Sequence, residues 1–228
     1  MNQEMNDETI NNKKISVIYV ISLGSCCHTA SFLKKEKLKL VSYPFDWVFS
    51  GPKMIYEILI DQFKSFLDKN QYTVLTEHRS GHKVYGHRFF NHKNPKEDVD
   101  YEYYKRCVVR FYDVINSQEH KLFIITNVID RNVRCVIAEE EIEYTNKICN
   151  YLKTICVNFS LMYINPVKLS QEEFNKLNKK FVIKQEGNLF WITMYVLSNS
   201  DGVRFRDDND NNTYRDCIYE LFDFNVKK

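Results

Sequence analysis

KLFIITNV at Lys121–Val128 and FSLMYINPV at Phe159–Val167 decide the fold of this chain. Both runs are mostly apolar, as expected of strands that are covered on both faces. Between them, residues 138–155 carry apolar side chains at helical spacing, namely Ile142, Ile148, Leu152 and Ile155. A strand, an amphipathic helix and a strand form a βαβ unit, and such crossovers build parallel sheets.

The segments before this unit predict three helices and a hairpin. Ile15–Leu23 (ISVIYVISL) is another buried-strand pattern, and Gly24 ends it before helical spacing begins at Ala30. A second helix is expected from Pro52, because proline suits the first turn of a helix, and a third over Asp98–Ser117. Short alternating stretches within Tyr72–Phe90 predict a β-hairpin.

The segments after the unit predict further strands and two helices. Ser170 and Glu173 have the spacing of a capping box and open a short helix. Strands are expected at Phe181–Lys184 and Leu189–Leu197, then a polar loop over Ser198–Asn212 and a final helix around Tyr214.

These elements predict one α/β domain over residues 15–228, with three layers, a largely parallel sheet and a small β-hairpin insertion. The chain of 228 residues is long enough for one good core, and it has neither an internal repeat nor a Pro/Gly/Ser linker. Residues 1–14 are polar and predict a disordered lead-in.

Composition constrains the partners. The chain has 32 basic and 30 acidic residues and a formal net charge of +2. Nucleic acids and membrane surfaces usually need a concentrated basic face, so neither is expected as a partner, and the oligomeric state stays open. No apolar run approaches the roughly 20 residues that span a bilayer, and the N-terminus lacks a secretory h-region. A cytoplasmic protein is therefore expected (host cytoplasm if the source is viral).

Seven cysteines are scattered along the chain without a repeated spacing or a CxxC pair. This pattern indicates neither a disulfide framework nor a zinc site, so we expect no metal and no cofactor. Cys107, Cys149 and Cys217 fall on apolar faces of predicted helices and are expected to be buried packing residues.

The turn after Ile15–Leu23 is the strongest candidate for chemistry. A helix N-terminus offers free N–H groups and a positive dipole end, which favour a thiolate and predict a lowered cysteine pKa. Cys26 and Cys27 lie at this place. A strand–glycine–helix turn can equally be structural, and GSCC matches neither phosphate-cradling glycine motif.

SLGSCCHTA at Ser22–Ala30, followed by SYPFDW at Ser42–Trp47, resembles an uncharacterised family described as putative papain-like cysteine peptidases, found in large DNA viruses and bacteria. The family pattern is SLGxxC followed by SxPFDW, and its spacing selects Cys27 over Cys26. The stretch Phe89–His92 resembles the FxH of that family. The resemblance implies a cysteine peptidase with an unknown peptide or acyl substrate, and it raises a papain-like α+β fold as the alternative architecture.

A thiol nucleophile needs a base within hydrogen-bond reach and usually a third group that orients the base. His92 matches the family stretch and is the first choice of base, with His87 as the alternate. His28 is a poor base, because neighbours on a helix do not face each other. Asp46 is the candidate third residue, although a carboxylate there can simply cap its loop, and Asp201 is the alternate.

Two functional hypotheses follow. The first is a thiol-dependent hydrolase or acyl-transfer enzyme, with Cys27 as nucleophile, His92 as base and backbone N–H groups at the turn holding the oxyanion. The second is a non-catalytic viral or host-interaction module, suggested by the aromatic strings YPFDWVF and DYEYYKR. A serine triad on Ser22 is weak, because no histidine follows His120. A sulfur-to-imidazole distance of about 3–4 Å would support the enzyme.

Overall fold

In a computed structural model of the chain, the structure describes residues 14–129, 132–133 and 137–226. The predicted lead-in, residues 1–14, lies outside the described residues apart from Lys14. Among the described residues, no helix is long and apolar enough to cross a bilayer.

A five-stranded sheet forms the middle layer, with the strand order β10-β11-β9-β6-β2. All pairings except β10–β11 are parallel. Its strands are β2 (Tyr19–Ser22), β6 (Lys121–Thr126), β9 (Phe159–Lys168), β10 (Phe181–Glu186) and β11 (Leu189–Val196). The three-layer α/β prediction with a largely parallel sheet is confirmed.

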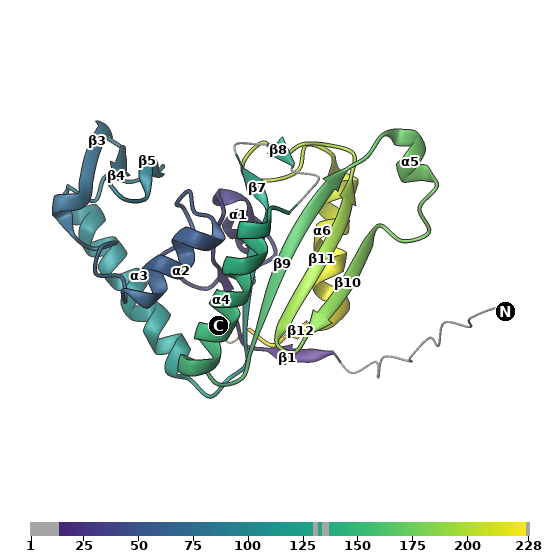
Figure 1. The fold of residues 1–228 in the computed structure, drawn as a ribbon, viewed down its shortest axis with the longest axis horizontal. Coiled ribbons are helices and arrows are strands. Elements are labelled where there is room, and N and C mark those ends of the chain that lie inside the picture. Colours follow the sequence, from purple (N-terminus) through teal and green to yellow (C-terminus); the bar gives the residue numbers. More distant parts are fainter. Residues whose placement is uncertain (1–13, 130–131, 134–136, 227–228) are drawn as a thin grey trace.

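Helices cover both faces of this sheet because its central strands are apolar on both sides (Figure 1). One face packs against α2 (Pro52–Ile60), α3 (Asp98–Asn116) and α4 (Glu139–Ile155), and the other against α1 (Cys27–Lys35) and α6 (Asp208–Leu221). Alternate residues of β6 belong to the two cores. Phe123 and Ile125 lie in the core with α2, α3 and α4, whereas Leu122 and Ile124 lie in the core with α1 and α6.

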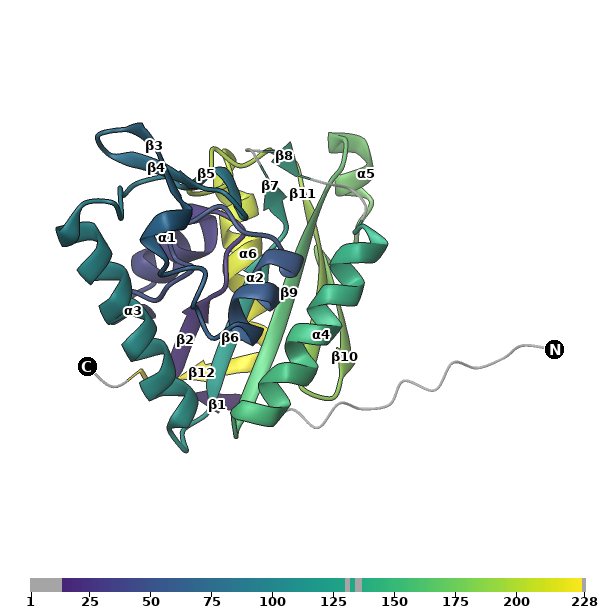
Figure 2. The ribbon, with the colours of Figure 1, turned by 60° about the vertical axis from the view of Figure 1, so that its left-hand side comes forward.

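The predicted hairpin is a separate three-stranded antiparallel sheet, formed by β3 (Tyr72–Thr76), β4 (Arg79–His82) and β5 (Gly86–Phe90). It lies near the start of α1 (Figure 2). The smaller elements are η1 (Lys69–Gln71), β7 (Val128–Ile129), β8 (Asn132–Val133), α5 (Gln171–Asn175) and β12 (Phe222–Phe224).

Three predicted boundaries differ from the structure. The single strand expected over Ile15–Leu23 is two strands, β1 (Ile15–Val17) and β2, and β1 pairs with β12 instead of the main sheet. The chain bends at Ile18, whose backbone N–H bonds to the carbonyl of His120. The apolar helical spacing that begins at Pro52 continues through Phe63, Phe66 and Leu67 in the sequence, but α2 ends at Ile60. α6 begins at Asp208, inside the predicted polar loop.

Candidate active site

Contacts with Ser50 and with Thr126 fix the turn between β2 and α1. Gly24 has φ +110° and a side chain there would collide with Ser50, so the position requires glycine. The Ser25 hydroxyl donates to the carbonyl of Thr126, at the end of β6. Thr29 hydrogen-bonds Thr126 at 2.8 Å. The turn is therefore fixed at the carboxyl edge of the parallel sheet, where α/β proteins place ligands.

The aromatic loop that contains PFDW links this turn to the hairpin. The Ser50 N–H donates to the carbonyl of Ser25 (3.0 Å), and the Phe49 N–H donates to the carbonyl of Phe89 (3.0 Å). Two adjacent residues of this loop thus connect two elements: Ser50 bonds to the turn between β2 and α1, and Phe49 bonds to β5. The relative position of Cys27 and the residues after β5 follows from these two contacts.

Aromatic packing anchors the strand that precedes His92. Phe89 and Phe90 are buried and lie against Phe66, with ring centroids 5.8 and 5.5 Å away. Phe90 also contacts Tyr104 of α3 at 4.9 Å. The chain after β5 therefore leaves a rigid part of the core, and His92 follows it by two residues.

Cys27 and His92 are in direct contact: Cys27 Sγ lies 3.1 Å from His92 Nε2. The distance falls within the range set by the sequence argument. Asn91 lies beside both groups, with its Nδ2 atom 3.3 Å from His92 Nε2 and a side-chain hydrogen bond to Cys27. The Trp47 and His92 rings are nearly perpendicular, with centroids 6.1 Å apart.

Electrostatics favour the neutral forms of both partners. Burial, and then the neighbouring Cys26, raise the pKa of Cys27 to about 12. Burial, and then the charge of Arg79, lower the pKa of His92. The predicted lowering of the cysteine pKa is wrong, because Cys27 is only 5% exposed and loss of hydration outweighs the helix N-terminus. At neutral pH the resting pair is a thiol and a neutral imidazole.

Asp46 is not brought to His92. Its carboxylate accepts from the Tyr43 N–H at 2.8 Å and pairs with Lys39 at 2.6 Å, and both side chains are buried. Within the described part of the chain, no hydrogen bond joins Asp46 to His92. Lys39 Nζ also lies 4.5 Å from the centroid of the Trp47 ring, and Trp47 packs against His92.

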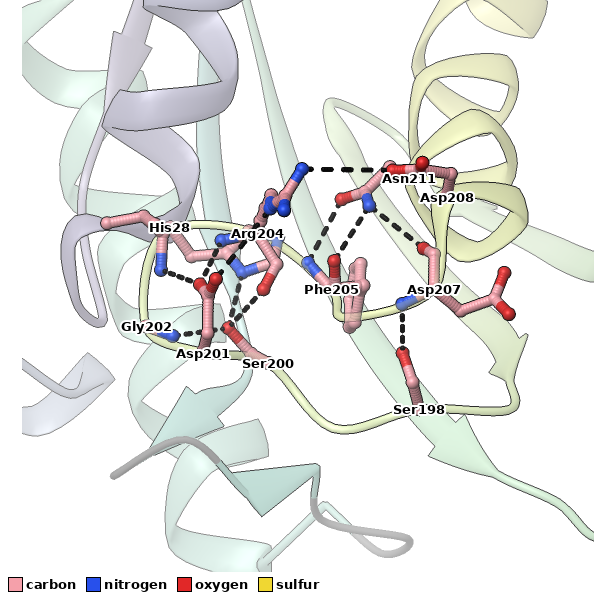
Figure 3. A network of polar contacts seen from close by, with 11 residues as sticks. His28, Ser198, Ser200, Asp201, Gly202, Arg204, Phe205, Asp207, Asp208 and Asn211 are labelled. Atoms are coloured by element: carbon pink, nitrogen blue, oxygen red, sulfur yellow. Dashed lines mark hydrogen bonds and ion pairs between the residues drawn. The ribbon is translucent and has the colours of Figure 1, made fainter.

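The three alternates lie around the same turn but have other contacts. The Cys26 thiol points to the carbonyl of Gly202 at 3.6 Å. His87 is exposed and lines a neighbouring cavity with Met54 and Tyr85, not the one at Cys27. Asp201 accepts from the N–H groups of Val203 and Arg204, both at 2.9 Å (Figure 3).

His28 is buried on the other side of α1. Its Nδ1 atom lies 2.9 Å from Ser200 Oγ, and its ring packs against Phe205 with centroids 4.6 Å apart (Figure 3). Burial lowers its pKa to about 4. As expected, His28 does not face Cys27. It ties the loop after β11 to the helix that carries the nucleophile.

A cavity of about 490 Å³ opens above the Cys27–His92 pair. Its lining comes from the nucleophile turn, the hairpin sheet and the loop after β11, and consists of Cys26, Cys27, Phe49, Arg79, Arg88, Asn91, His92, Asp201, Gly202 and Val203. No group of three or more His, Cys, Asp or Glu residues in the described ranges could hold a metal ion. The arrangement can support thiol attack on a carbonyl with proton transfer to the imidazole.

Sequence reasoning missed three residues with polar side chains in this cavity, Arg79, Arg88 and Asn91. Asn91 adjoins the chosen histidine, so the FNH string was a usable signal. Nothing in the sequence pointed to the two arginines, because the pairing of β4 with β5 brings them to the same cavity.

A family model described as "Putative papain-like cysteine peptidase (DUF1796)" matches residues 18–168. The matched region begins just before β2, ends with β9, and contains Cys27, Asp46 and His92. No curated protein and no solved structure matches the chain.

Proposed function

This chain belongs to that family of putative papain-like cysteine peptidases, and on this premise we propose that it is a thiol-dependent hydrolase or acyl-transfer enzyme. Cys27 is the nucleophile and His92 is the general base. The observation that carries the proposal is the 3.1 Å contact between Cys27 Sγ and His92 Nε2 at the floor of a cavity. A cysteine at the head of a helix and a histidine after an antiparallel sheet also suit a papain-like site.

The neutral resting pair defines the first step. His92 accepts the thiol proton at Nε2 as Cys27 Sγ attacks the substrate carbonyl, and a carbon–sulfur bond forms. The imidazolium then gives that proton to the leaving group, whose bond to the carbonyl carbon breaks. Water, deprotonated by His92, or another acceptor next releases the acyl group from the sulfur. The imidazole has to be neutral to begin the cycle, and the lowered pKa of His92 keeps it neutral at pH 7.

Two N–H groups are placed to stabilise the charge that develops on the carbonyl oxygen. Cys27 is the first residue of α1, and its own backbone N–H lies beside its sulfur. The Asn91 side-chain amide lies beside the same sulfur. An oxyanion on a carbon bonded to Sγ would therefore sit within reach of both donors, and removal of one such donor typically costs about 10²-fold or more in rate.

Acyl transfer from p-nitrophenyl acetate tests the proposal without knowledge of the natural substrate. We expect a burst of nitrophenol equal to the enzyme concentration, with the acetyl group located on Cys27 by peptide mass mapping. Cys27→Ala removes the burst. Cys26→Ser is the matched control, because it changes the adjacent thiol of the same cavity and keeps the burst.

A burst that survives in Cys27→Ala, or an acetyl group mapped to Cys26, would overturn the assignment. A buried Cys27 with no histidine within reach and no cleft above it would favour the rival hypothesis of a non-catalytic interaction module. Instead, His92 lies 3.1 Å from the sulfur and a cavity opens above the pair. Of the aromatic string YPFDWVF, Tyr43, Phe45 and Val48 are buried in the core, whereas Trp47 and Phe49 are partly exposed.

A further inference from the structure

A second cavity of about 290 Å³, here called the side cavity, adjoins the one above the Cys27–His92 pair. Phe49 and Arg88 belong to the lining of both cavities, so the two meet at these residues. Ser25 also lines the side cavity. Because two residues of extended chain span at most about 7 Å, the side cavity begins close to the nucleophile. A group attached to a carbonyl at Cys27 is therefore within reach of it.

Most of the wall of the side cavity is apolar and held in place by packing. Phe49, Met54, Tyr85 and Phe89 line it. The Tyr85 ring stacks on the buried His82 ring with centroids 4.2 Å apart, and it contacts the Phe89 ring at 5.2 Å. Ligand pockets are typically lined by such apolar groups and largely formed before the ligand binds. The wall therefore suits an apolar ligand group.

The polar side chains of the lining are engaged elsewhere or reach water. The hydroxyl groups of Ser25, Ser50 and Tyr85 each form a hydrogen bond with a residue outside the lining. His87 and Arg88 are exposed, and long polar side chains keep their polar ends in water while their stems cover apolar surface. The side chains of the lining therefore favour an apolar ligand group over a polar one.

Gly51 keeps one side of this cavity open, although the backbone does not require glycine there. It precedes α2 with φ −124° and ψ 170°, an extended conformation that any residue adopts. A Cβ atom at this position would meet nothing within 4 Å, whereas one at Gly24 would collide with Ser50. A larger side chain at position 51 is therefore sterically allowed, and its absence leaves space in the side cavity.

We propose that the side cavity binds an apolar group of the substrate, carried on the acyl side of the carbonyl that Cys27 attacks. The volume of about 290 Å³ is just below the roughly 300–1,000 Å³ of pockets that hold whole ligands, so it suits one group of a larger substrate. Each methylene buried there contributes up to about fourfold to the acylation rate constant. This inference rests on the proposed function, because it concerns the substrate of the same thiol.

The burst rates of p-nitrophenyl acetate, butyrate, hexanoate and 3-phenylpropanoate test the side cavity. In each reaction Cys27 sulfur bonds to the carbonyl carbon, the bond from that carbon to nitrophenolate breaks, and the thiol proton passes through His92 to the leaving group. We expect the hexanoate-to-acetate ratio of rate constants to exceed that of N-acetylcysteine by about tenfold or more. The comparison of hexanoate with 3-phenylpropanoate shows whether a linear chain or an aromatic ring fits better.

Two failures are distinguishable in this assay. Absence of a burst with every ester would contradict the proposed function itself. A burst whose ratios for both longer acyl groups equal those of N-acetylcysteine overturns the side cavity as a substrate site while Cys27 remains a nucleophile.

Substitutions that fill or enlarge the side cavity identify the source of the preference. Gly51→Leu occupies the space, so the hexanoate-to-acetate ratio falls to that of N-acetylcysteine. Met54→Ala removes part of the wall, so the preference moves toward p-nitrophenyl octanoate. Asn150→Leu is the control, because it adds the same leucine at an exposed position of α4 outside both linings and leaves the ratio unchanged. A ratio that neither Gly51→Leu nor Met54→Ala changes overturns the inference.

A second measurement removes the dependence on thiol reactivity. Cys27→Ala is titrated with hexanamide and, separately, with acetamide, and the Met54 methyl signal is followed by NMR. A saturable shift with hexanamide that acetamide does not produce, and that Gly51→Leu abolishes, supports the inference. If hexanamide leaves the Met54 signal in place, or shifts it equally in Gly51→Leu, the apolar site is contradicted, whatever the reactivity of Cys27.

Discussion

Two opposing effects act on the Cys27 thiol, and their sum decides how the site can work. The N-terminus of α1 favours a thiolate, whereas burial and the adjacent Cys26 favour the thiol, and the second group prevails with a pKa of about 12. The sequence showed the helix start but not the burial of the sulfur. A site with this balance needs the neutral imidazole of His92 to remove the proton during attack.

Substitution of Asp46 tests whether this carboxylate stabilises the fold or takes part in catalysis. Burial raises the pKa of Asp46, and Lys39 opposes that rise. Asp46→Asn would leave the Lys39 ammonium, whose side chain is 7% exposed, without its partner. We expect the free energy of unfolding in urea to fall by roughly 3 kcal/mol. The Cys27 alkylation rate of the folded protein should change far less than in His92→Ala.

Asp98→Asn is the matched control, because Asp98 forms an ion pair with Lys69 at the same 2.6 Å distance but on the surface. Its unfolding midpoint should stay at the wild-type value. If Asp46→Asn instead kept full stability and lost Cys27 reactivity as completely as His92→Ala, Asp46 would belong to the catalytic group.

At the scale of elements, the apolar periodicity of the sequence predicted where strands and helices occur, but it did not predict the points at which they break or end. The buried strands β6 and β9, the helix α4 between them and the capping box at Ser170 follow the sequence prediction closely. The bend at Ile18 was not visible, because an unbroken apolar run continues through it. The pairing of β1 with β12 joins residues about 200 positions apart, and local patterns carry no information on such a contact.

The contact between α1 and the loop after β11 predicts a pH dependence of stability. His28 is fully buried, and its pKa falls from 6.5 to about 4 on folding. Between these two pH values the unfolded chain binds more protons than the folded chain, so the free energy of unfolding rises with pH across that window. The contribution of His28 to stability is complete above pH 6.5. This difference in pKa corresponds to roughly 3 kcal/mol of stability, which is lost as the pH falls to 4.

His28→Asn tests this dependence through the slope of stability against pH rather than through the stability itself. Urea unfolding at a series of pH values from 4 to 7 should give a clearly flatter curve for the variant. His78→Asn, at an exposed histidine of the hairpin sheet region, should keep the wild-type slope. Equal slopes for wild type and His28→Asn would show that this histidine is not buried as a neutral group.

At the scale of the whole molecule, the site is assembled from segments that the sequence keeps far apart. The nucleophile follows β2, the base follows β5, and the third wall is the loop after β11. The family resemblance pointed to Cys27 and His92, and these two side chains lie in contact. The sequence alone could not show why they meet. The structure supplies the reason: the segment Val48–Ser50 bonds to the turn at Ser25 and to β5 at Phe89 and Phe90.

This assembly from distant segments explains why some residues of the site could not be predicted from the sequence. Arg79 and Arg88 are unremarkable in the sequence, and only the register of the hairpin brings both to the cavity. The buried pair of Lys39 and Asp46 depends on a loop conformation that periodicity does not describe. Chemical type and spacing suggested the reacting pair, whereas the walls of the cavity around that pair depend on long-range packing.

The central claim is that His92 activates Cys27, and the pH profile of Cys27 alkylation by iodoacetamide tests it most directly. In the wild type we expect the rate to rise through a midpoint below pH 6.5, as His92 loses its proton, and to rise again at high pH as the thiol ionises. In His92→Ala the first rise disappears, and the rate at pH 7 falls by roughly 10²-fold. His87→Ala keeps the wild-type profile. A His92→Ala profile identical to that of the wild type, or a first rise lost in His87→Ala instead, would contradict the account.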